Sequence, residues 1–348
     1  EFTQVDLEMS FVEPRDVMEV VENYIKYLFF EVLSLDIKTP FQVLSYSEAM
    51  SRFGSDKPDL RYGLELVDLT EFAKKSGFGV FANAGAVVAL PVKNGAASYP
   101  RKEIDRLEAH VKGIGAKGLA WIKYSEDGIS CPFAKFLNEG ERNELITMLK
   151  LEKGDAAFII AAEKRKTALQ IMGTVRGLAA EKLGLLTDEF NFLWVTEFPF
   201  FEYDEEKGEY TAMHHPFTAP LDITALERDK EKVFAKAYDL VLNGFELSSG
   251  SIRITDPVLQ QKMFDSLGLS KEASEQKFGY LLNAFKYGVP PHGGMGIGLD
   301  RLIMLMLGSS NIRDVIAFPK TQNAVEPMTD CPSKIDEIQM KELGLKHC

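Results

Sequence analysis

The first eleven residues alternate strictly in polarity, and this pattern constrains the fold of the chain more than any other. Every second residue from Thr3 to Phe11 falls on one face of an extended chain, and the intervening residues fall on the other. The second face carries Gln4, Asp6 and Glu8. A period of two is typical of a half-buried β-strand. The pattern therefore predicts a strand with one face on a core, whose polar face is either solvated or part of a site.

The composition favours a globular small-molecule enzyme over a general nucleic-acid binder. The chain has 348 residues, 45% of them hydrophobic, and a formal net charge of −12. That charge opposes the many phosphate contacts of general binding, although one local basic surface could still hold a shaped RNA. No apolar run has the length of a membrane span, and the start does not resemble a signal peptide. Cys131, Cys331 and Cys348 lack metal-ligand spacing, so we expect reduced thiols in a cytosolic protein.

Periodicity and turn residues divide the chain into three stretches, residues 1–62, 63–174 and 175–348. In the first, a helical pattern runs from Val17 through Val20 to Phe29, and a loop follows from Gly54 to Arg61. In the second, helical patterns, the clearest over 101–111, alternate with strand-like runs at residues 80–82, 87–92, 119–124 and 157–161. Such alternation predicts a self-contained α+β unit. The third stretch holds most of the candidate chemistry.

A hairpin is predicted around Asn243-Gly244, because this dipeptide is the strongest short hairpin signal. A two-residue turn pairs Leu242 with Phe245, Val241 with Glu246, and Asp239 with Ser248. Asp239 and Glu246 are then diagonal neighbours on one face, within joint reach of a cation such as Mg²⁺. From this geometry alone, a metal site and two solvated carboxylates are equally good interpretations.

Arg253 follows the same hairpin, but strict alternation from Glu246 would place it on the opposite face. A bulge is needed to bring both side chains to one face, and Ser248-Ser249-Gly250 is the expected place for it.

Further patterns leave alternatives open. The glycine run from Gly293 to Gly298 predicts close approach by a ligand, or tight helix packing. The adjacent His214 and His215 suit a metal site, yet no other histidine or cysteine stands at ligand spacing.

Segments throughout the chain carry a resemblance to one family. They are EFTQVDLEMSF at the start, GSDKPDLR in the loop, FAKKSGFGVF and RKEIDRLE in the second stretch, and NGFELSSGSIR, GGMGIGLDR and IRDVIAFPKT in the third. Together they resemble class II aminoacyl-tRNA synthetases, and most closely the aspartate enzymes of the bacterial type. The resemblance implies an α+β fold with an antiparallel-sheet catalytic core in residues 1–62 and 175–348. A GAD-like α+β insertion domain would interrupt this core over residues 63–174.

The resemblance also assigns the nucleotide end of a site. Phe2 and Arg301 would stack on opposite faces of adenine, since a guanidinium plane can cover an aromatic base and also meet phosphate oxygens. Asp239 and Glu246 would hold Mg²⁺, with Glu246 also contacting ATP. Arg301, Glu246 and Arg253 would be the catalytic residues. The remaining residues that would contact ATP are Gly298, Leu299 and Asp300.

At the amino-acid end of the site, the resemblance places Arg253 on the side-chain carboxylate of aspartate. A guanidinium can donate two parallel hydrogen bonds to the two oxygens of a carboxylate. Gln4 and Asp6 would hold the amino group. His214 would be the direct contact to aspartate, with His215 as support. We expect a partly protonated imidazole there, because it would complement an anionic substrate.

The implied activity is aspartate–tRNA ligation: ATP activates L-aspartate to an adenylate, which is transferred to the 3′ end of tRNA. Expected partners are L-aspartate and tRNA(Asp), with tRNA(Asn) left open; the intact parent is expected to be a cytoplasmic homodimer with no membrane association. Residues 1–11 match the second strand of motif 2, so we expect an N-terminally truncated fragment that is inactive alone. The alternatives are a sister ligase for asparagine or lysine, a non-catalytic or degenerate tRNA-binding paralogue, and an amidotransferase subunit.

Overall fold

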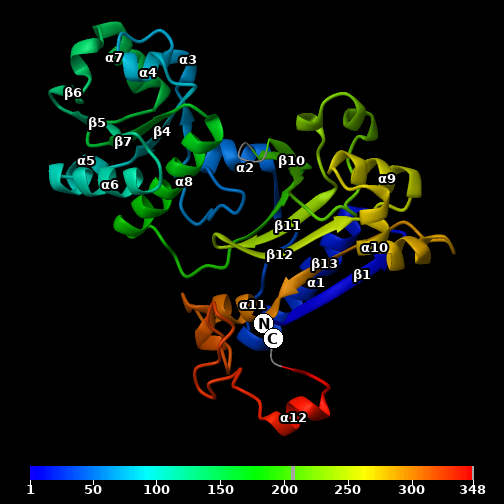
Figure 1. Cartoon of the computed structure of the whole chain (residues 1–348). Helices are drawn as coiled ribbons and strands as arrows, with labels where there is room; N and C mark the ends of the chain where they lie inside the picture. The colour runs from blue at the N-terminus through cyan, green and yellow to red at the C-terminus, as the bar shows by residue number, and fades with distance from the viewer. Residues whose placement is uncertain (205–207, 347–348) are drawn as a thin grey trace. The chain divides into compact units, whose positions relative to one another are not determined.

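The computed structural model describes residues 1–204 and 208–346 (Figure 1). Cys348 lies outside this range, whereas Cys131 and Cys331 are free cysteines within it. The chain forms two compact units, residues 1–7 with 296–348 and residues 8–295. The division falls inside the strands β1 (Gln4–Ser10) and β13 (His292–Gly298).

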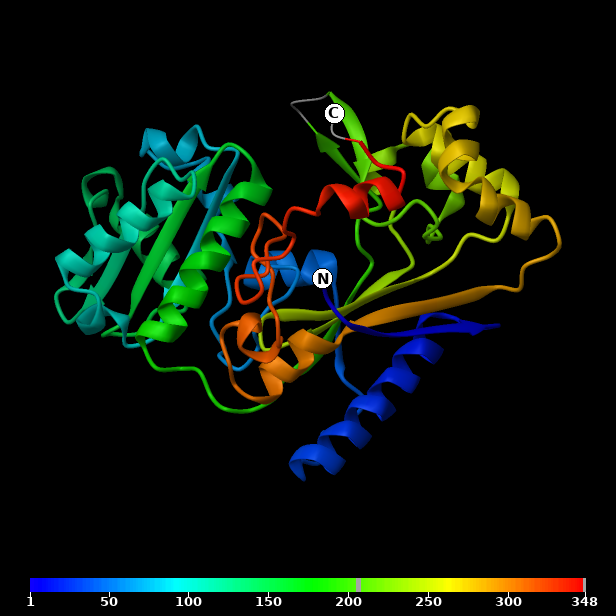
Figure 2. The same ribbon diagram turned by 60° about the horizontal axis from the view of Figure 1, so that its bottom comes forward.

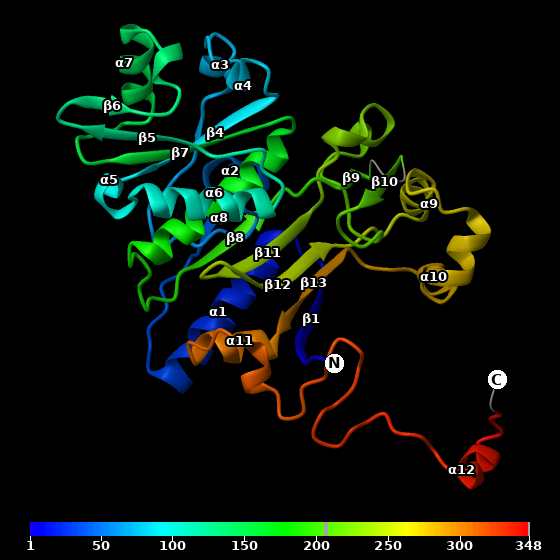
Figure 3. The ribbon, with the colours of Figure 1, turned by 60° about the vertical axis from the view of Figure 1, so that its left-hand side comes forward.

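The larger sheet has six strands in the order β1-β13-β12-β11-β8-β2 (Figure 3). The strands not yet delimited are β12 (Phe245–Ile252), β11 (Ala237–Leu242), β8 (Phe192–Thr196) and β2 (Gln42–Ser45). Strand β11 pairs antiparallel with β12 and β8, while β2 runs parallel to β8. A core that includes Leu44, Val195 and Val241 lies on one face of the sheet.

The first strand confirms the predicted alternation. Its odd-numbered residues Val5, Leu7 and Met9 are half-buried, and its even-numbered residues are exposed. One face of β1 is thus partly covered and the other is open to solvent, as the pleat of a strand allows. The polar face is therefore available for a site.

Helix α1 (Pro14–Leu33) begins at a capping box formed by Glu13 and Asp16. Its fully buried apolar stripe repeats every fourth residue, over Val17, Val21, Ile25 and Phe29. Val20 was predicted on this stripe but is 44% exposed. Successive residues of a helix are about 100° apart, so each step of four residues advances the buried stripe by about 40° in one direction from Val17. A step of three residues places Val20 about 60° from Val17 in the other direction, outside the stripe.

A second, antiparallel sheet of five strands has the order β3-β4-β7-β5-β6. Its strands are β3 (Val67–Asp68), β4 (Ala86–Val92), β7 (Ala156–Ala162), β5 (Ala120–Ser125) and β6 (Gly128–Ser130). Helices α6 (Arg101–Gly113) and α8 (Arg165–Lys182), the latter green in Figure 2, contribute to the core on one face. Helices α3 (Thr70–Ala73), α4 (Gly79–Ala82) and α7 (Glu139–Met148) contribute to the core on the other.

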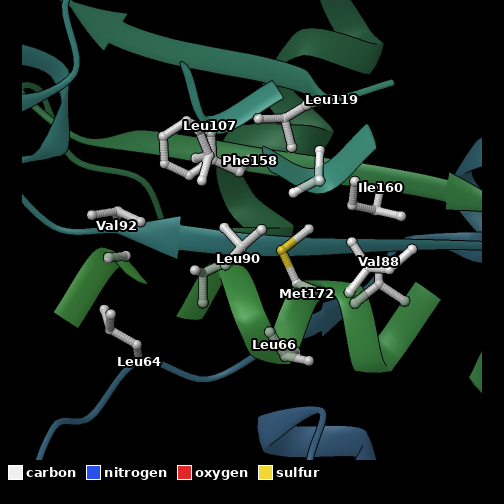
Figure 4. Packing of buried hydrophobic residues seen from close by; sticks show 14 of the residues in the cluster. Leu64, Leu66, Val88, Leu90, Val92, Leu107, Leu119, Phe158, Ile160 and Met172 are labelled. Carbon is white, nitrogen blue, oxygen red and sulfur yellow. The ribbon is translucent and has the colours of Figure 1, made fainter. Parts of the chain in front are cut away.

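Alternating side chains of β4 supply both cores of this sheet. Val88 and Leu90 pack with Phe158 and Met172 in one cluster (Figure 4), while Val87 joins the other. A strand covered on both faces is continuously apolar, as β4 is. The predicted strands over 87–92, 119–124 and 157–161 and the helix over 101–111 are confirmed.

The strand predicted over residues 80–82 is wrong, because these residues form helix α4. The amide of Ala82 donates to the carbonyl of Phe78, which is a helical i→i−4 bond. Phe81 is buried against Phe78 and Phe133. Three apolar residues are too few to distinguish a period of two from one of 3.6, so the aromatic cluster decided the conformation.

The remaining elements connect or flank these two sheets, and two of them, β9 (Phe201–Asp204) and β10 (Glu209–Ala212), pair antiparallel as a third sheet. The others are α2 (Tyr46–Phe53), α5 (Gly95–Ser98), α9 (Pro257–Ser266), α10 (Lys271–Phe285), α11 (Leu299–Met306), α12 (Glu337–Glu342) and the 3₁₀ turns Ala134–Phe136, Ile223–Glu227, Lys230–Lys232 and Ile312–Val315. The α+β class with antiparallel sheets is confirmed. The three-part division at residues 62 and 174 stays a prediction, since α8 runs across the second boundary. Among the helices of the described residues, none is both long and apolar enough to span a membrane.

Candidate active site

The β11–β12 hairpin carries the predicted turn. Asn243 has φ 51° and Gly244 has φ 87°, the positive values that a type I′ turn requires at both central positions. The predicted pairs Leu242–Phe245 and Val241–Glu246 are confirmed. The hairpin therefore positions Asp239 and Glu246 as the local sequence indicates.

The pairing of Asp239 with Ser248 was wrong, because a bulge lies closer to the turn than expected. Ser248 pairs with Leu240, so Leu247 is the extra residue and Asp239 pairs with Ser249. Leu247 is 2% exposed, and burying this side chain favours the bulge at its position over one in the small residues that follow. One extra residue shifts the alternation by one position. Glu246 and Arg253 are thereby brought to the same face, which is the outcome the bulge was invoked to explain.

Asp239 is a buried carboxylate with an unsatisfied oxygen. It is 8% exposed, and its Oδ1 atom has no hydrogen-bond partner. Burial and the charge of Glu246 together raise the pKa of Asp239 to about 7, against the lowering effect of a hydrogen bond from Ser249. The side chain of Glu246 is more open, with 39% of its surface exposed. A cation would satisfy the buried oxygen and favour the ionised form.

The donor set of this hairpin fits Mg²⁺. Across residues 1–204 and 208–346 there is no cluster of three or more histidine, cysteine, aspartate or glutamate side chains arranged to hold a metal. Mg²⁺ commonly takes one or two carboxylates from the protein and completes its shell with water and substrate phosphates. Asp239 and Glu246 would supply those two carboxylates. Bound there, Mg²⁺ would neutralise charge on a nucleotide.

Arg253 lies in a polar network of residues that are far apart in the sequence. Its Nε and Nη2 atoms donate to the two carboxylate oxygens of Glu8, each at 3.0 Å. Its Nη1 atom donates to Ser251 Oγ at 2.5 Å and to His215 Nε2 at 2.6 Å. The side chain is only 19% exposed. The guanidinium is therefore held in one orientation with four of its five N–H donors engaged, so a bidentate contact to a substrate carboxylate would take the place of Glu8.

The two histidines differ from the expectation of a partly protonated imidazole. Burial lowers the pKa of His214, and burial together with the charge of Arg253 lowers the pKa of His215 to about 4. Because Arg253 can only donate, His215 Nε2 must accept, and the neutral ring carries its proton on Nδ1. His214 Nε2 is buried without a partner, and its ring packs edge-on against Phe198. Both rings thus act as neutral polar groups.

Gln4 and Asp6 belong to the smaller compact unit, where they lie over Gly296. A Cβ atom on Gly296 would lie 2.6 Å from Asp6 Oδ1 and 2.7 Å from Gln4 Nε2. Only glycine leaves room for these two side-chain ends. The structure brings Gln4 and Asp6 together within this unit, and their meeting with Arg253 at one substrate stays a prediction.

Phe2 and the residues from Gly298 to Arg301 also lie in the smaller unit. The amide of Thr3 donates to Asp300 Oδ2, and the amide of Leu299 donates to the carbonyl of Thr3, each at 2.9 Å. These bonds join the start of the chain to the first turn of α11, which Gly298 caps and which contains Arg301. Phe2 is 75% exposed and lines a cavity of about 530 Å³ with Asp300 but not Arg301. The start of the chain thus lies beside the first turn of α11, and the stacking of Phe2 and Arg301 on adenine stays a prediction.

Sequence reasoning missed two charged side chains near these residues. Glu8 binds Arg253, and its place on the polar face of β1 with Gln4 and Asp6 was the available signal. Lys57 Nζ lies 3.9 Å from Glu246 Oε2, and no local pattern predicted this contact across the sequence.

Comparison with known sequences defines the class of protein. Residues 1–322 match the sequence model of the family described as tRNA synthetases class II (D, K and N), and the chain belongs to this family. It is 51% identical to an Aspartate--tRNA ligase of Clostridium perfringens over 354 residues, 99% of this chain and 59% of that protein. An Aspartate--tRNA(Asp/Asn) ligase of Caldanaerobacter subterraneus subsp. tengcongensis is 51% identical over 353 residues, with the same coverage. The chain thus spans 59% of the length of these relatives.

Among solved structures, an aspartyl tRNA synthetase from Entamoeba histolytica matches with a TM-score of 0.43 and 20% sequence identity. The match covers 94% of this chain and 44% of that chain.

Proposed function

We propose that the full-length protein is an aspartate–tRNA ligase that uses ATP and Mg²⁺. The observation that carries the proposal is the shared face of the β11–β12 hairpin. The guanidinium of Arg253, held in one orientation, extends from this face. The same face carries Asp239, whose buried carboxylate has an oxygen without a hydrogen-bond partner. A fork matches a substrate carboxylate and repels an ammonium side chain. Relatives at 51% identity carry the name Aspartate--tRNA ligase, which supports aspartate as the amino acid.

In the first proposed step, Arg253 binds the side-chain carboxylate of aspartate, while Gln4 and Asp6 hold its ammonium group. His214 contacts the substrate and His215 supports Arg253. The α-carboxylate of aspartate attacks the α-phosphorus of ATP in line, the bond to the β-phosphate breaks, and pyrophosphate leaves. Phe2 and Arg301 position the adenine. This chemistry depends on positioning and charge neutralisation and requires no protein nucleophile.

In the second proposed step, a hydroxyl of the terminal ribose of tRNA attacks the carbonyl carbon of aspartyl adenylate. The ester forms, the bond to AMP breaks, and AMP leaves. We propose tRNA(Asp) as the acceptor. The relatives' names differ on a second acceptor, since one reads tRNA(Asp/Asn), so tRNA(Asn) is tested beside it. A homodimer working in the cytoplasm is part of the same proposal.

The test is ATP–pyrophosphate exchange by the full-length protein with aspartate, asparagine or lysine as the amino acid. Exchange should depend on aspartate and Mg²⁺, and Arg253→Gln should reduce kcat/KM for aspartate at least a hundredfold, since one partner of a charged bidentate contact is removed. Arg101→Gln is the control, because Arg101 forms an exposed ion pair with Asp105 within α6. Exchange driven by asparagine or lysine would establish a sister ligase. No exchange with any amino acid, together with retained tRNA binding, would establish a non-catalytic paralogue.

A further inference from the structure

Lys57 approaches the two carboxylates of the hairpin from the loop between α2 and β3. Lys57 Nζ lies 3.9 Å from Glu246 Oε2 and 3.9 Å from Asp56 Oδ1. Both distances exceed the range of a hydrogen bond, so neither oxygen holds the ammonium tightly. The side chain is 47% exposed, which leaves it accessible to a ligand. Lys57 is therefore placed at the cation site without being committed to one partner.

The loop that carries Lys57 is fixed two residues further on. Asp59 is 8% exposed and accepts hydrogen bonds from the backbone amide and the guanidinium of Arg61. Arg176 of α8 donates to the carbonyl of Asp59 at 2.7 Å. The hairpin turn packs on the same residue, since a Cβ on Gly244 would lie 3.3 Å from Asp59 Cβ. The loop and the hairpin are thus held together, and the approach of Lys57 to Glu246 follows from that packing.

Acidic side chains and one lysine gather around this point. Asp239, Glu246 and Asp56 are acidic. Lys57 lies among them and forms ion pairs with Asp56 and Glu246. A divalent cation held by Asp239 and Glu246 would take over Glu246 and repel the ammonium. A triphosphate brought by that cation is anionic and offers oxygens to a lysine, which commonly binds phosphate as a point charge.

We propose that Lys57 contacts the phosphates of a Mg²⁺-bound nucleoside triphosphate, and the released pyrophosphate, exchanging Glu246 for a phosphate oxygen when the metal is present. The inference rests on the proposed function in taking ATP as the nucleotide. It assigns the loop from Gly54 to Arg61 to the binding site and gives Lys57 a direct ligand contact. No bond is made or broken in this exchange of partners.

The experiment measures binding of Mg²⁺–ATP and of Mg²⁺–pyrophosphate by calorimetry in the full-length protein and its Lys57→Met, Lys57→Arg and Lys74→Met variants. Lys74 is the matched control, because its ion pair is with exposed Glu71 of the short helix α3. Lys57→Met should weaken both ligands about tenfold or more, the effect of losing one charge-assisted hydrogen bond. Lys57→Arg should retain most of the affinity, and Lys74→Met all of it.

Binding of Mn²⁺ without nucleotide, followed by electron paramagnetic resonance, separates a ligand contact from a structural role. Removing a competing cation should leave Mn²⁺ affinity unchanged or increase it in Lys57→Met. Wild-type affinity of Lys57→Met for both phosphate ligands, or a parallel loss of Mn²⁺ binding, would overturn the inference. Lys57-dependent ATP binding in a protein that shows no aspartate-dependent exchange would uphold the inference and overturn only the proposed function.

Discussion

Glu8 holds the guanidinium of Arg253 through two hydrogen bonds of 3.0 Å, although 245 residues separate them in the sequence. In the sheet, β13 lies between the strand of Glu8 and the strand that leads to Arg253. Neighbouring strands are about 4.8 Å apart, so a pair that crosses one strand needs two long side chains and an open face between them. At this point β13 carries His292, whose Nε2 lies 3.9 Å from Glu8 Oε1 and whose carbonyl accepts from the backbone amide of Arg253. The pair fixes Arg253 in an orientation suited to a carboxylate.

The coupling between Glu8 and Arg253 can be measured by a double-mutant cycle of Glu8→Gln and Arg253→Gln in urea unfolding. We expect a coupling free energy of about 0.5–1 kcal/mol, because the geometry is bidentate but half of the Glu8 side chain is exposed. The Glu71 and Lys74 pair, 81% and 56% exposed, is the control and should couple by less than about 0.3 kcal/mol. Equal coupling in the two cycles would contradict the assigned role of Glu8.

Gly296→Ala should impair aspartate binding with little effect on folding. The added methyl group would meet the ends of Asp6 and Gln4, which are flexible and would move aside. We therefore expect a change of less than about 1 kcal/mol in the free energy of unfolding. The KM for aspartate in exchange should rise about tenfold. Gly177→Ala in α8, where a Cβ meets nothing within 4 Å, should leave that KM unchanged. An unaltered KM in Gly296→Ala would remove Gln4 and Asp6 from the substrate site.

Arg176 is expected to contribute strongly to stability. It is 3% exposed and donates to the carbonyls of Asp59, Tyr62 and Leu64. Arg176→Met would leave buried carbonyls unsatisfied, so the free energy of unfolding should fall by about 3 kcal/mol or more. Urea denaturation measures it, with exposed Arg106→Met as the control at less than about 0.5 kcal/mol. A small loss in Arg176→Met would mean that water replaces the guanidinium.

The pH dependence of stability should carry a contribution from His215. The pKa of His215 is about 4 in the folded protein, below its ordinary value of 6.5. As the pH falls, the ring therefore takes up a proton in the unfolded chain before it does so in the folded protein. The contribution is therefore present above pH 6.5 and is lost as the pH falls from 6.5 to 4. Unfolding measured across this window should show a steeper decline in the wild type than in His215→Gln. An NMR titration of the ring with a midpoint near 6.5 would contradict the buried, neutral assignment.

Local patterns in the sequence were sufficient for the features that depend on neighbouring residues. The alternation around Gln4 and Asp6 predicted β1, and Asn243-Gly244 predicted the turn with its first two pairs. Each depends on backbone preferences over a few residues, which a sequence states directly.

Only the tertiary structure decided which distant groups meet. It placed the bulge at Leu247, turned residues 80–82 into a helix around Phe81, and set Glu8 on Arg253 and Lys57 beside Glu246. These outcomes depend on burial and on packing between segments far apart in the chain. No short window of sequence contains both partners of such a contact, so its energy enters only when the sheets assemble.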